Sequence, residues 1–563
     1  MKSIFAKQKS QANLQRNAFD LSRSSIFSAS AGMLLPCFVE EVNPNEHFEI
    51  SPSSFLRTMP LNTAAYTRLK QNVEFYFVPY RLLMRQFPQF VVGTEYKISS
   101  ITQLNNYTAN IPGIDFQKTL LALAQASISK SASYEVDTLG YPAWRGTCRL
   151  LDLLGYGVSA RVVSDAAKAN TGITIRDIAN VKVNPFRLLA YQKVYYDFYR
   201  NPYYELNDPQ AYNIDSSYLS SNTLLPVWNN TFGTSTNKMY MLRYRNWKKD
   251  YFNAISPYFQ GSDYLTDSVS APEFAHFNNG GAVALTENVS NNFLSALVNA
   301  SDSTNKPFVT FNISNLRAAY ALDKLYRLSI AAGDGDYASQ IKAHYGFALP
   351  HDSMKSTFIG SVDAPVTISE VVTTATTDRG EAADIFGKGL SANRDKTIRF
   401  DTKEHGIIIG LFSVVPECDY SSLMLDKFNS KFGREDYYQP EFADLGKQPV
   451  DPYEFSAEYF NPRQNSPMGY INRYAEYKTK VDKVHGELAP GGSLDAWSTV
   501  RQYASFNSTT GVTNPFFKIN PAVLDKIFAN VYDGSETSDQ FLVDLTCQVS
   551  AVRPMSVTGE PAL

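Results

Sequence analysis

The sequence predicts a mainly β fold, an antiparallel barrel or sandwich whose strands are separated by long insertions. Strand-like segments lie at both ends of the 563-residue chain, whereas helical patterns lie in the middle. The first and last strands commonly pair when such a sheet closes. Because single cores rarely grow beyond about 250–300 residues, much of the chain must lie in the insertions. The sequence has no repeat of about 20–50 residues and no linker rich in proline or glycine, so we expect one decorated domain.

The clearest strand lies near the C-terminus, in the stretch FLVDLTCQVSAV that begins at Phe541. Apolar and polar residues alternate there over a full strand length, which places one set on each face of a sheet. Near the N-terminus, LLPCFVEEVNPNEHFEI predicts two short strands on either side of Asn43-Pro44-Asn45. The alternating apolar set of the C-terminal strand is Phe541, Val543, Leu545, Cys547, Val549 and Ala551.

The stretch NVEFYFVPYRLL, residues 72–83, predicts a strand that ends at a proline. Nearly all of its residues are apolar or aromatic, so both faces of the alternation must be covered. Either another layer of the same chain or a neighbouring chain could cover the second face. Two further stretches also predict strands, GIIIGLFSVVPE from Gly406 and GYINRYAEYKTK from Gly469.

Helical patterns occupy two stretches in the middle of the chain. Residues 184–202 contain apolar side chains on one helical face and end at Asn201-Pro202, which stops a helix. Residues 313–335 predict a second helix, with Ser314 as N-cap and Gly333 as its stop. Between the two helices, residues 260–307 are polar and predict a long surface excursion. The apolar face of the first helix consists of Tyr191, Val194, Tyr195 and Phe198.

Composition favours a protein that is buried in an assembly. Aromatic residues make up 13% of the chain and charged residues only 19%, below the roughly 25% usual in soluble domains. Large aromatic side chains are enriched where chains bury surface against one another, although an aromatic core would give the same count. The net charge of −3 argues against a chain that binds polyanions over its whole surface.

The N-terminus departs from this average. Residues 1–24 form a basic arm with a local net charge of +4, because Asp20 is its only acidic residue. Such an arm could lie along a phosphate backbone and release counterions, or it could be a solvated tail, and both interpretations stay open. The five candidate nucleic-acid contacts are Lys2, Lys7, Lys9, Arg16 and Arg23.

The sequence contains no catalytic, cofactor or metal motif that we can identify. Phosphate-loop, zinc-protease and hydrolase signatures are absent, and the six histidines are scattered. The GDGDY stretch at Gly333 lacks the acidic spacing of a calcium loop, so a turn after a helix is the better interpretation. We therefore expect no catalytic residue, no bound cofactor and no metal.

Cysteine use and hydropathy indicate a chain made in the cytoplasm. The four cysteines, Cys37, Cys148, Cys418 and Cys547, lie far apart, so we expect reduced and mostly buried thiols. The longest apolar run, residues 406–415, is too short to span a membrane, and the first residues lack the apolar core of a signal peptide.

Two alternative functions remain from the residues alone. A monomeric β-sandwich that binds carbohydrate could use tyrosines and tryptophans, although core or interface packing is the better interpretation of each tryptophan. An enzyme built on a cupin-like jelly roll would need clustered histidine and glutamate ligands, which the sequence lacks. The tryptophans available for sugar binding are Trp144, Trp228, Trp247 and Trp497.

Several stretches taken together resemble the major capsid proteins of microviruses, small single-stranded DNA phages, and particularly their gokushovirus-like branch. They begin with FDLSRSS, LLPCFVEEVNPNEHFEI and FYFVPYRLL and continue through VNPFRLLAYQKVYYDFYRNP and RNWKKDYFNAISPYFQ. Later come ISNLRAAYALDKLYRLSIAAGDGDYASQIKAHYG, IIIGLFSVVPECDY, FADLGKQPV, GYINRYAEYKTKVDKVHGEL and the closing AVRPMSVTGEPAL. The resemblance follows the family's order over nearly the whole chain and departs from it mainly at residues 260–307 and 491–513.

This resemblance implies an eight-stranded antiparallel jelly roll with large insertions, spanning residues 25–563 after the basic arm. It implies copies that form pentamers and then a T=1 icosahedral shell of sixty subunits around circular single-stranded DNA. A small basic packaging protein and a scaffold protein are the implied partners. An insertion at residues 260–310 would form a surface protrusion that meets a host receptor such as a glycan. The mature protein would reside in the virion after synthesis in a bacterial cytoplasm.

Overall fold

The fold is described from a computed structural model of the chain. The residues it describes are 16–92, 111–128, 143–159, 163, 181–215, 238–257, 274–276, 282–284, 317, 321, 324–325, 328, 337–347, 354–372, 385–393, 396–443, 446–457, 467–501, 511–529 and 539–557. All structural statements below concern these residues.

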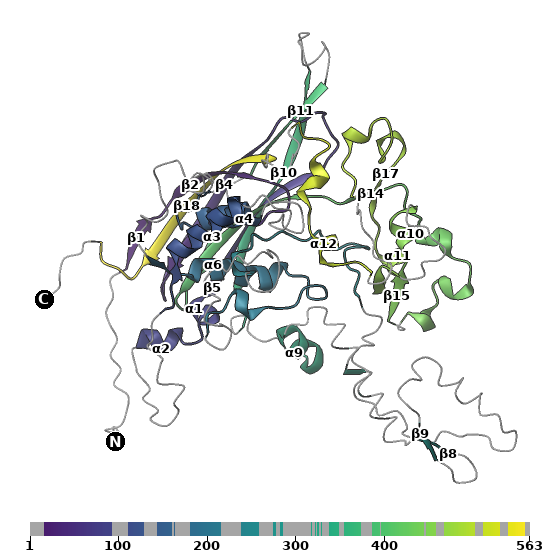
Figure 1. Ribbon diagram of the computed structural model, residues 1–563, viewed down its shortest axis with the longest axis horizontal. Helices are drawn as coiled ribbons and strands as arrows, with labels where there is room; N and C mark the ends of the chain where they lie inside the picture. The colour runs from purple at the N-terminus through teal and green to yellow at the C-terminus, as the bar shows by residue number, and fades with distance from the viewer. Residues whose placement is uncertain are drawn as a thin grey trace.

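Eight strands of one curved antiparallel sheet form the centre of the molecule (Figure 1). They run in two groups of four, in the orders β2-β18-β4-β11 and β10-β5-β13-β3, and β10 joins the groups by pairing with both β5 and β11. The strands are β2 (Arg23–Ala29), β3 (Leu35–Val42), β4 (His47–Thr58), β5 (Leu69–Pro79), β10 (Thr357–Val372), β11 (Ile385–Ala392), β13 (Gly406–Pro416) and β18 (Phe541–Arg553).

The strands pair in a nested order that identifies the topology. Among these eight strands, the first, β2, pairs with the last, β18; β3 pairs with β13, β4 with β11, and β5 with β10. This pattern arises when one long antiparallel hairpin wraps around a barrel, which is the eight-stranded jelly roll. The predicted fold class and the predicted pairing of terminal strands are both confirmed. Two short strands extend the sheet, β1 (Asn17–Asp20) on β18 and β12 (Ile398–Asp401) on β4.

The predicted strands at the ends of the chain match the structure. The alternate apolar residues of β18 are buried and the residues between them are mostly exposed. The turn between β3 and β4 lies at the predicted Asn43-Pro44-Asn45, and Asn45 adopts a positive φ of 67°. Asparagine tolerates this left-handed conformation better than most residues, so the turn is encoded locally.

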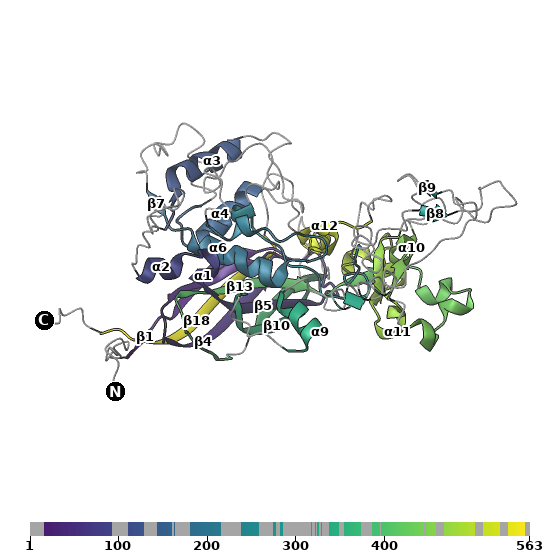
Figure 2. The ribbon, with the colours of Figure 1, turned by 90° about the horizontal axis from the view of Figure 1, so that it is seen from below.

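Two long insertions account for most of the remaining chain. One lies between β5 and β10, and the other lies between β13 and β18. Figure 2 shows helices of the first insertion on one side of the sheet. Its described helices and strands are α1 (Tyr80–Leu83), α2 (Phe87–Val92), β6 (Ile114–Asp115), α3 (Phe116–Ile128), α4 (Ala143–Leu153), β7 (Lys182–Val183), α6 (Phe186–Val194), β8 (Phe274–His276), β9 (Ala282–Ala284) and α9 (Tyr337–Tyr345). The second contains β14 (Asp419–Ser421), β15 (Lys447–Val450), α10 (Pro452–Phe455), β16 (Gly469–Asn472), α11 (Ala475–Lys478), β17 (Asp482–Val484) and α12 (Asn514–Phe517).

The helix predicted at residues 184–202 is confirmed, with one correction to its buried face. α6 continues into a π-helical turn, Tyr195–Tyr199, before the chain extends at Arg200. Tyr191, Val194 and Tyr195 are buried as predicted, but Phe198 is 40% exposed. The wider π turn rotates the following residues away from the α-helical positions, so the α-helical period does not hold there.

Two other predictions have different outcomes. The strand predicted over GYINRYAEYKTK is wrong beyond its first residues, because Tyr474 adopts a positive φ of 59° and the chain turns into α11. In the helix predicted at residues 313–335, the five described residues are helical and the rest lie outside the described residues. Most of the polar stretch at 260–307 also lies outside them, apart from the antiparallel hairpin of β8 and β9.

Buried apolar side chains form two clusters. The larger fills the jelly roll and the space between the sheet and the helices of the first insertion. The smaller lies between the two insertions, with Phe252 from the first and Tyr420 and Phe516 from the second, and it meets the larger cluster at Cys418. None of the described helices is long and apolar enough to cross a lipid bilayer.

Candidate functional site

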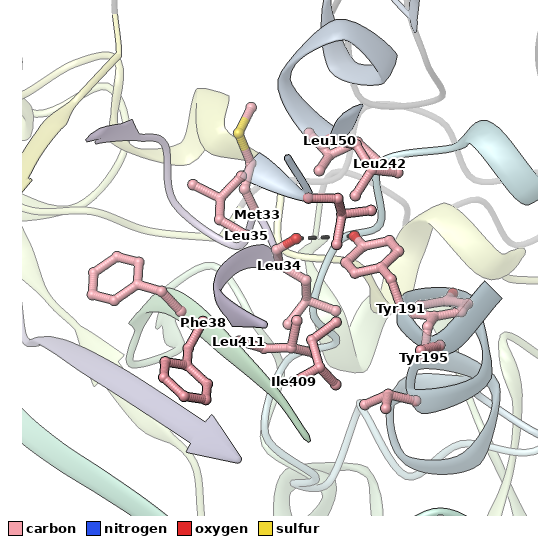
Figure 3. Packing of buried hydrophobic residues seen from close by; sticks show 14 of the residues in the cluster. Met33, Leu34, Leu35, Phe38, Leu150, Tyr191, Tyr195, Leu242, Ile409 and Leu411 are labelled. Atoms are coloured by element: carbon pink, nitrogen blue, oxygen red, sulfur yellow. Dashed lines mark hydrogen bonds between the residues drawn. The ribbon is translucent and has the colours of Figure 1, made fainter. Parts of the chain in front are cut away.

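The outer face of β5 is covered by the first insertion of the same chain. α6 packs across β5 and β13, and the Tyr191 hydroxyl donates a hydrogen bond of 2.9 Å to the carbonyl of Leu34 (Figure 3). Leu34 lies immediately before β3, and Ile409 and Leu411 of β13 lie beside it, next to the helix, in the same view. The second apolar face of the strand predicted at residues 72–83 is therefore covered by another layer of the same chain.

Polar contacts fix this cover at one place. Arg245 makes a bidentate contact with Glu74 of β5, at 2.9 Å and 3.1 Å, and also reaches Ser413. The Tyr199 hydroxyl donates to the same carboxylate and lies 2.8 Å from the hydroxyl of Tyr76. Paired and hydrogen-bonded charges of this kind fix a register, because any displaced arrangement would leave a buried charge without a partner.

A second buried charge cluster joins the two insertions. Arg243 and Lys518 both approach Glu205, at 3.4 Å and 3.6 Å, so two buried cations share one carboxylate. The Lys518 ammonium also donates to the Tyr195 hydroxyl at 2.5 Å. Burial, together with repulsion from Arg243, lowers the pKa of Lys518 to about 8, although Glu205 acts in the opposite direction. The cluster is structural, because the side chains of Arg243, Lys518 and Glu205 are at most 12% exposed and already contact one another.

A groove of about 1790 Å³ opens beside these contacts, between the first insertion, β5 and the second insertion. Eleven lysines and arginines line it, against six carboxylates. Several of its cations are already balanced, since Lys193 pairs with Asp197 at 2.8 Å and Lys70 pairs with Glu417 at 2.7 Å. Lys248 and Lys249 are exposed and form no ion pair within the described part of the chain.

Aromatic side chains line this groove together with the cations. Phe198 and Tyr337 are exposed, and Trp247 lies directly before the lysine pair. A positively charged groove with exposed aromatic rings is typical of sites that bind single-stranded nucleic acid, because the cations attract the phosphates and the rings stack on the bases. Sequence reasoning did not identify the groove, because its lining comes from segments between Lys70 and Phe517. A local signal was present in RYRNWKK, residues 243–249, where basic and aromatic residues alternate.

The structure describes two of the five predicted nucleic-acid contacts. Arg16 donates to the backbone and side-chain oxygens of Asn45, at 2.5 Å and 2.6 Å. Arg23 pairs with Glu40 of β3 at 2.8 Å and lies 4.3 Å from the ring of Phe38. From Asn17 onward the predicted arm is part of the sheet, as β1 and β2. Lys2, Lys7 and Lys9 lie outside the described residues.

An exposed aromatic patch lies on the second insertion. Phe432 is 90% exposed. The ammonium of the adjacent Lys431 lies 4.2 Å from the ring of Tyr477 and 2.6 Å from Glu476. Contiguous apolar surface on a soluble chain commonly marks a protein contact. The aromatic patch consists of Phe428, Phe432, Tyr437, Tyr438, Phe442 and Tyr477.

The cysteines, possible metal ligands and tryptophans of the described residues form no further candidate site. The four cysteines are free thiols, as predicted, and burial raises the pKa of Cys148 to about 12 and that of Cys418 and Cys547 to about 11. Within the described ranges, no three metal-binding side chains are grouped to hold an ion. Trp247 is buried, whereas Trp144 and Trp497 pack in other parts of the molecule, and Trp228 lies outside the described residues.

Comparison with known proteins adds a consistent finding. The family model for the phage "Capsid protein (F protein)" matches residues 8–137 and 161–563. The "Capsid protein VP1" of Chlamydia phage 1 is 23% identical, over 98% of this chain and 96% of that protein. The "Capsid protein VP1" of Bdellovibrio phage phiMH2K is 21% identical, over 94% of this chain and 92% of that protein.

Proposed function

Because this chain belongs to the phage capsid protein (F protein) family of microviruses, we propose that it forms a T=1 icosahedral shell around a circular single-stranded DNA genome. The family is one of structural proteins, so the chain is a major capsid protein of the virion and not an enzyme. The observation that carries the proposal is the nested jelly roll, whose sheet is covered by an insertion of the same chain and so can act as the building block of a shell.

Subunits would assemble through the surfaces that each folded chain leaves exposed. A capsid protein forms a homo-oligomeric shell, and we propose pentamers as the intermediate between subunit and shell. Closed shells need heterologous contacts around their rotation axes, in which two different surfaces meet. The aromatic patch supplies one such surface. A small basic packaging protein and a scaffold protein are the further partners in this proposal.

The basic arm is proposed to contact the genome. Lys2, Lys7 and Lys9 precede β1, the strand at one end of the sheet, so changing them should not disturb the core. Contacts of this kind neutralise phosphates and read no sequence. Replacing Lys2, Lys7 and Lys9 by Gln should lower the DNA content of particles or their resistance to salt. A matched change of Lys182, Lys342 and Lys403, three exposed lysines outside the arm, should leave both unchanged.

Arg16 and Arg23 also belong to this proposal, but their test needs a different readout. Each makes a contact inside the subunit, so a change to Gln would also weaken the fold. Packaged DNA should therefore be compared at equal amounts of assembled particles. If DNA content per particle is unchanged in all five arm variants, the arm serves protein contacts only.

The insertion at residues 260–310 is proposed as a protrusion that meets the host receptor. Both ribbon views place its β8–β9 hairpin away from the sheet (Figures 1 and 2). Deleting most of the insertion should leave particles intact and reduce attachment to host cells. Loss of all assembly would instead indicate that the insertion is buried between subunits.

Electron microscopy of the purified particle fraction tests the main proposal. After external nuclease treatment, we expect small icosahedral shells from which intact single-stranded DNA can be extracted. A monodisperse monomer without protected DNA would refute the shell and favour the carbohydrate-binding alternative.

A further inference from the structure

The strands β10 and β11 form a ribbon that extends beyond the rest of the sheet (Figure 1). β10 pairs with β5 only as far as Val366, and β11 pairs with β4 only from Leu390 onward. Between these limits β10 and β11 pair with each other, up to Val372 opposite Ile385. We name the segments Thr367–Val372 and Ile385–Gly389 the β10–β11 ribbon.

The ribbon is held by backbone hydrogen bonds at Gly387, two residues from the end of the paired segment. Gly387 exchanges two backbone hydrogen bonds with Leu61, at 3.2 Å and 3.3 Å. A Cβ atom at this position would lie 2.4 Å from the carbonyl oxygen of Thr63, closer than any real contact. Glycine therefore allows the loop at Leu61 to clamp the ribbon. The direction in which the ribbon leaves the sheet is fixed by this clamp.

Both faces of the ribbon end are apolar and exposed. Val371 and Phe386 are paired on one face and are 47% and 37% exposed. Val372 and Ile385 are paired on the other face and are 52% and 39% exposed. Successive strand residues point to opposite faces, so no single covering layer could bury all four. A two-stranded ribbon with two bare apolar faces is marginally stable in water.

One edge of the ribbon is also open. No strand in the described part of the chain pairs with β10 beyond Val366 on the side away from β11. Its backbone N–H and C=O groups there can accept another strand. Natural proteins protect exposed edges with charge, proline or a cover, and an unprotected apolar edge marks a contact with another chain.

We propose that the β10–β11 ribbon docks onto a second copy of this chain. The inference rests on the proposed shell function, because a capsid protein meets neighbouring copies permanently. Permanent contacts between identical chains bury more apolar surface than transient ones, which suits four apolar side chains on two faces. The ribbon end has only Glu370 and Lys388 as charged residues, so it lacks the single-sign charge that would steer a nucleic acid.

Threonine substitutions test the docking while keeping β-branched side chains in the ribbon. We would compare the full-length parent with the triple variant Val371→Thr, Val372→Thr, Ile385→Thr. Leu206→Thr, at another exposed apolar residue, is the control. The triple variant should keep the thermal unfolding profile of the parent subunit and need at least tenfold more protein to assemble. Assembly at the parent concentration would overturn the proposal.

A second outcome would assign the ribbon to another partner. If the triple variant assembles normally but its particles adsorb poorly to host cells, the ribbon meets the host and the proposal is wrong. Should the variant fail to fold, hydrogen exchange on the unmodified protein decides the matter. Amides of Thr367–Val372 should exchange at least tenfold more slowly in particles than in dissociated subunits, and equal rates would overturn the proposal. Failure of the parent chain to form particles at all would instead refute the proposed shell function.

Discussion

Lys518 provides a quantitative test of the contact between the two insertions. It is a buried cation that shares Glu205 with Arg243, and its pKa is lowered to about 8. In the unfolded chain a lysine titrates near pH 10.4. Each pKa unit corresponds to about 1.4 kcal/mol, so ionised Lys518 destabilises the folded subunit by about 3 kcal/mol relative to an unperturbed lysine.

The sign of the pH effect follows from proton counts. Below pH 8 both states keep the proton, so Lys518 adds no pH dependence. As pH rises above 8, the folded state loses the proton while the unfolded state keeps it, and this group's contribution to the unfolding free energy rises. The rise amounts to about 1.5 kcal/mol between pH 8 and pH 9.5. The four cysteine thiols act in the opposite direction, since desolvation raises their pKa values and the unfolded thiols ionise first.

The comparison of parent and Lys518→Met isolates the lysine, because the thiol contributions are the same in both proteins. Urea unfolding of the unassembled subunit would be measured between pH 7 and pH 9.5 under reducing conditions. Between pH 8 and pH 9.5, the unfolding free energy of the parent should rise by about 1.5 kcal/mol more than that of Lys518→Met. Lys526→Met, at an exposed lysine paired with Asp495, is the control and should follow the parent. Parallel profiles for parent and Lys518→Met would refute the reasoning.

Three further predictions follow from single contacts. Arg245→Met should destabilise the subunit by about 3 kcal/mol, because Glu74 loses its charge partner, and adding Glu74→Gln should recover much of the loss in chemical unfolding. Gly387→Ala should lower the thermal midpoint and assembly yield, because its Cβ meets a backbone carbonyl at 2.4 Å, whereas Lys403→Ala, at an exposed lysine outside the ribbon, should change neither. Phe432→Ser with Tyr438→Ser should leave the thermal midpoint unchanged and reduce particle yield in sedimentation, and normal yield would remove the aromatic patch from assembly.

The strands were predictable where one face is buried and the other is exposed. β18 shows this alternation in its sequence, and the turn at Asn43-Pro44-Asn45 has its own local signal. β5 was predictable as a strand, but the layer over its outer face was not. That layer comes from α6 and Arg245, more than a hundred residues later, and no local pattern encodes such a distant contact.

The errors have local physical causes that a periodicity argument does not include. Tyr474 adopts a left-handed conformation, which only rare non-glycine residues do, and it ends the strand predicted from Gly469. The π turn at Tyr195–Tyr199 changes the helical period at Phe198. The groove was missed because its residues come together only in the folded chain, although residues 243–249 carried a basic and aromatic signal.

A reconstruction of the native particle by electron cryomicroscopy tests the central claim most directly. The account predicts a T=1 shell in which each jelly roll is covered by its own first insertion, with Arg245 and Glu74 paired within one copy. A shell in which a neighbouring copy supplies the cover of β5, or a chain that forms no closed shell, would contradict it.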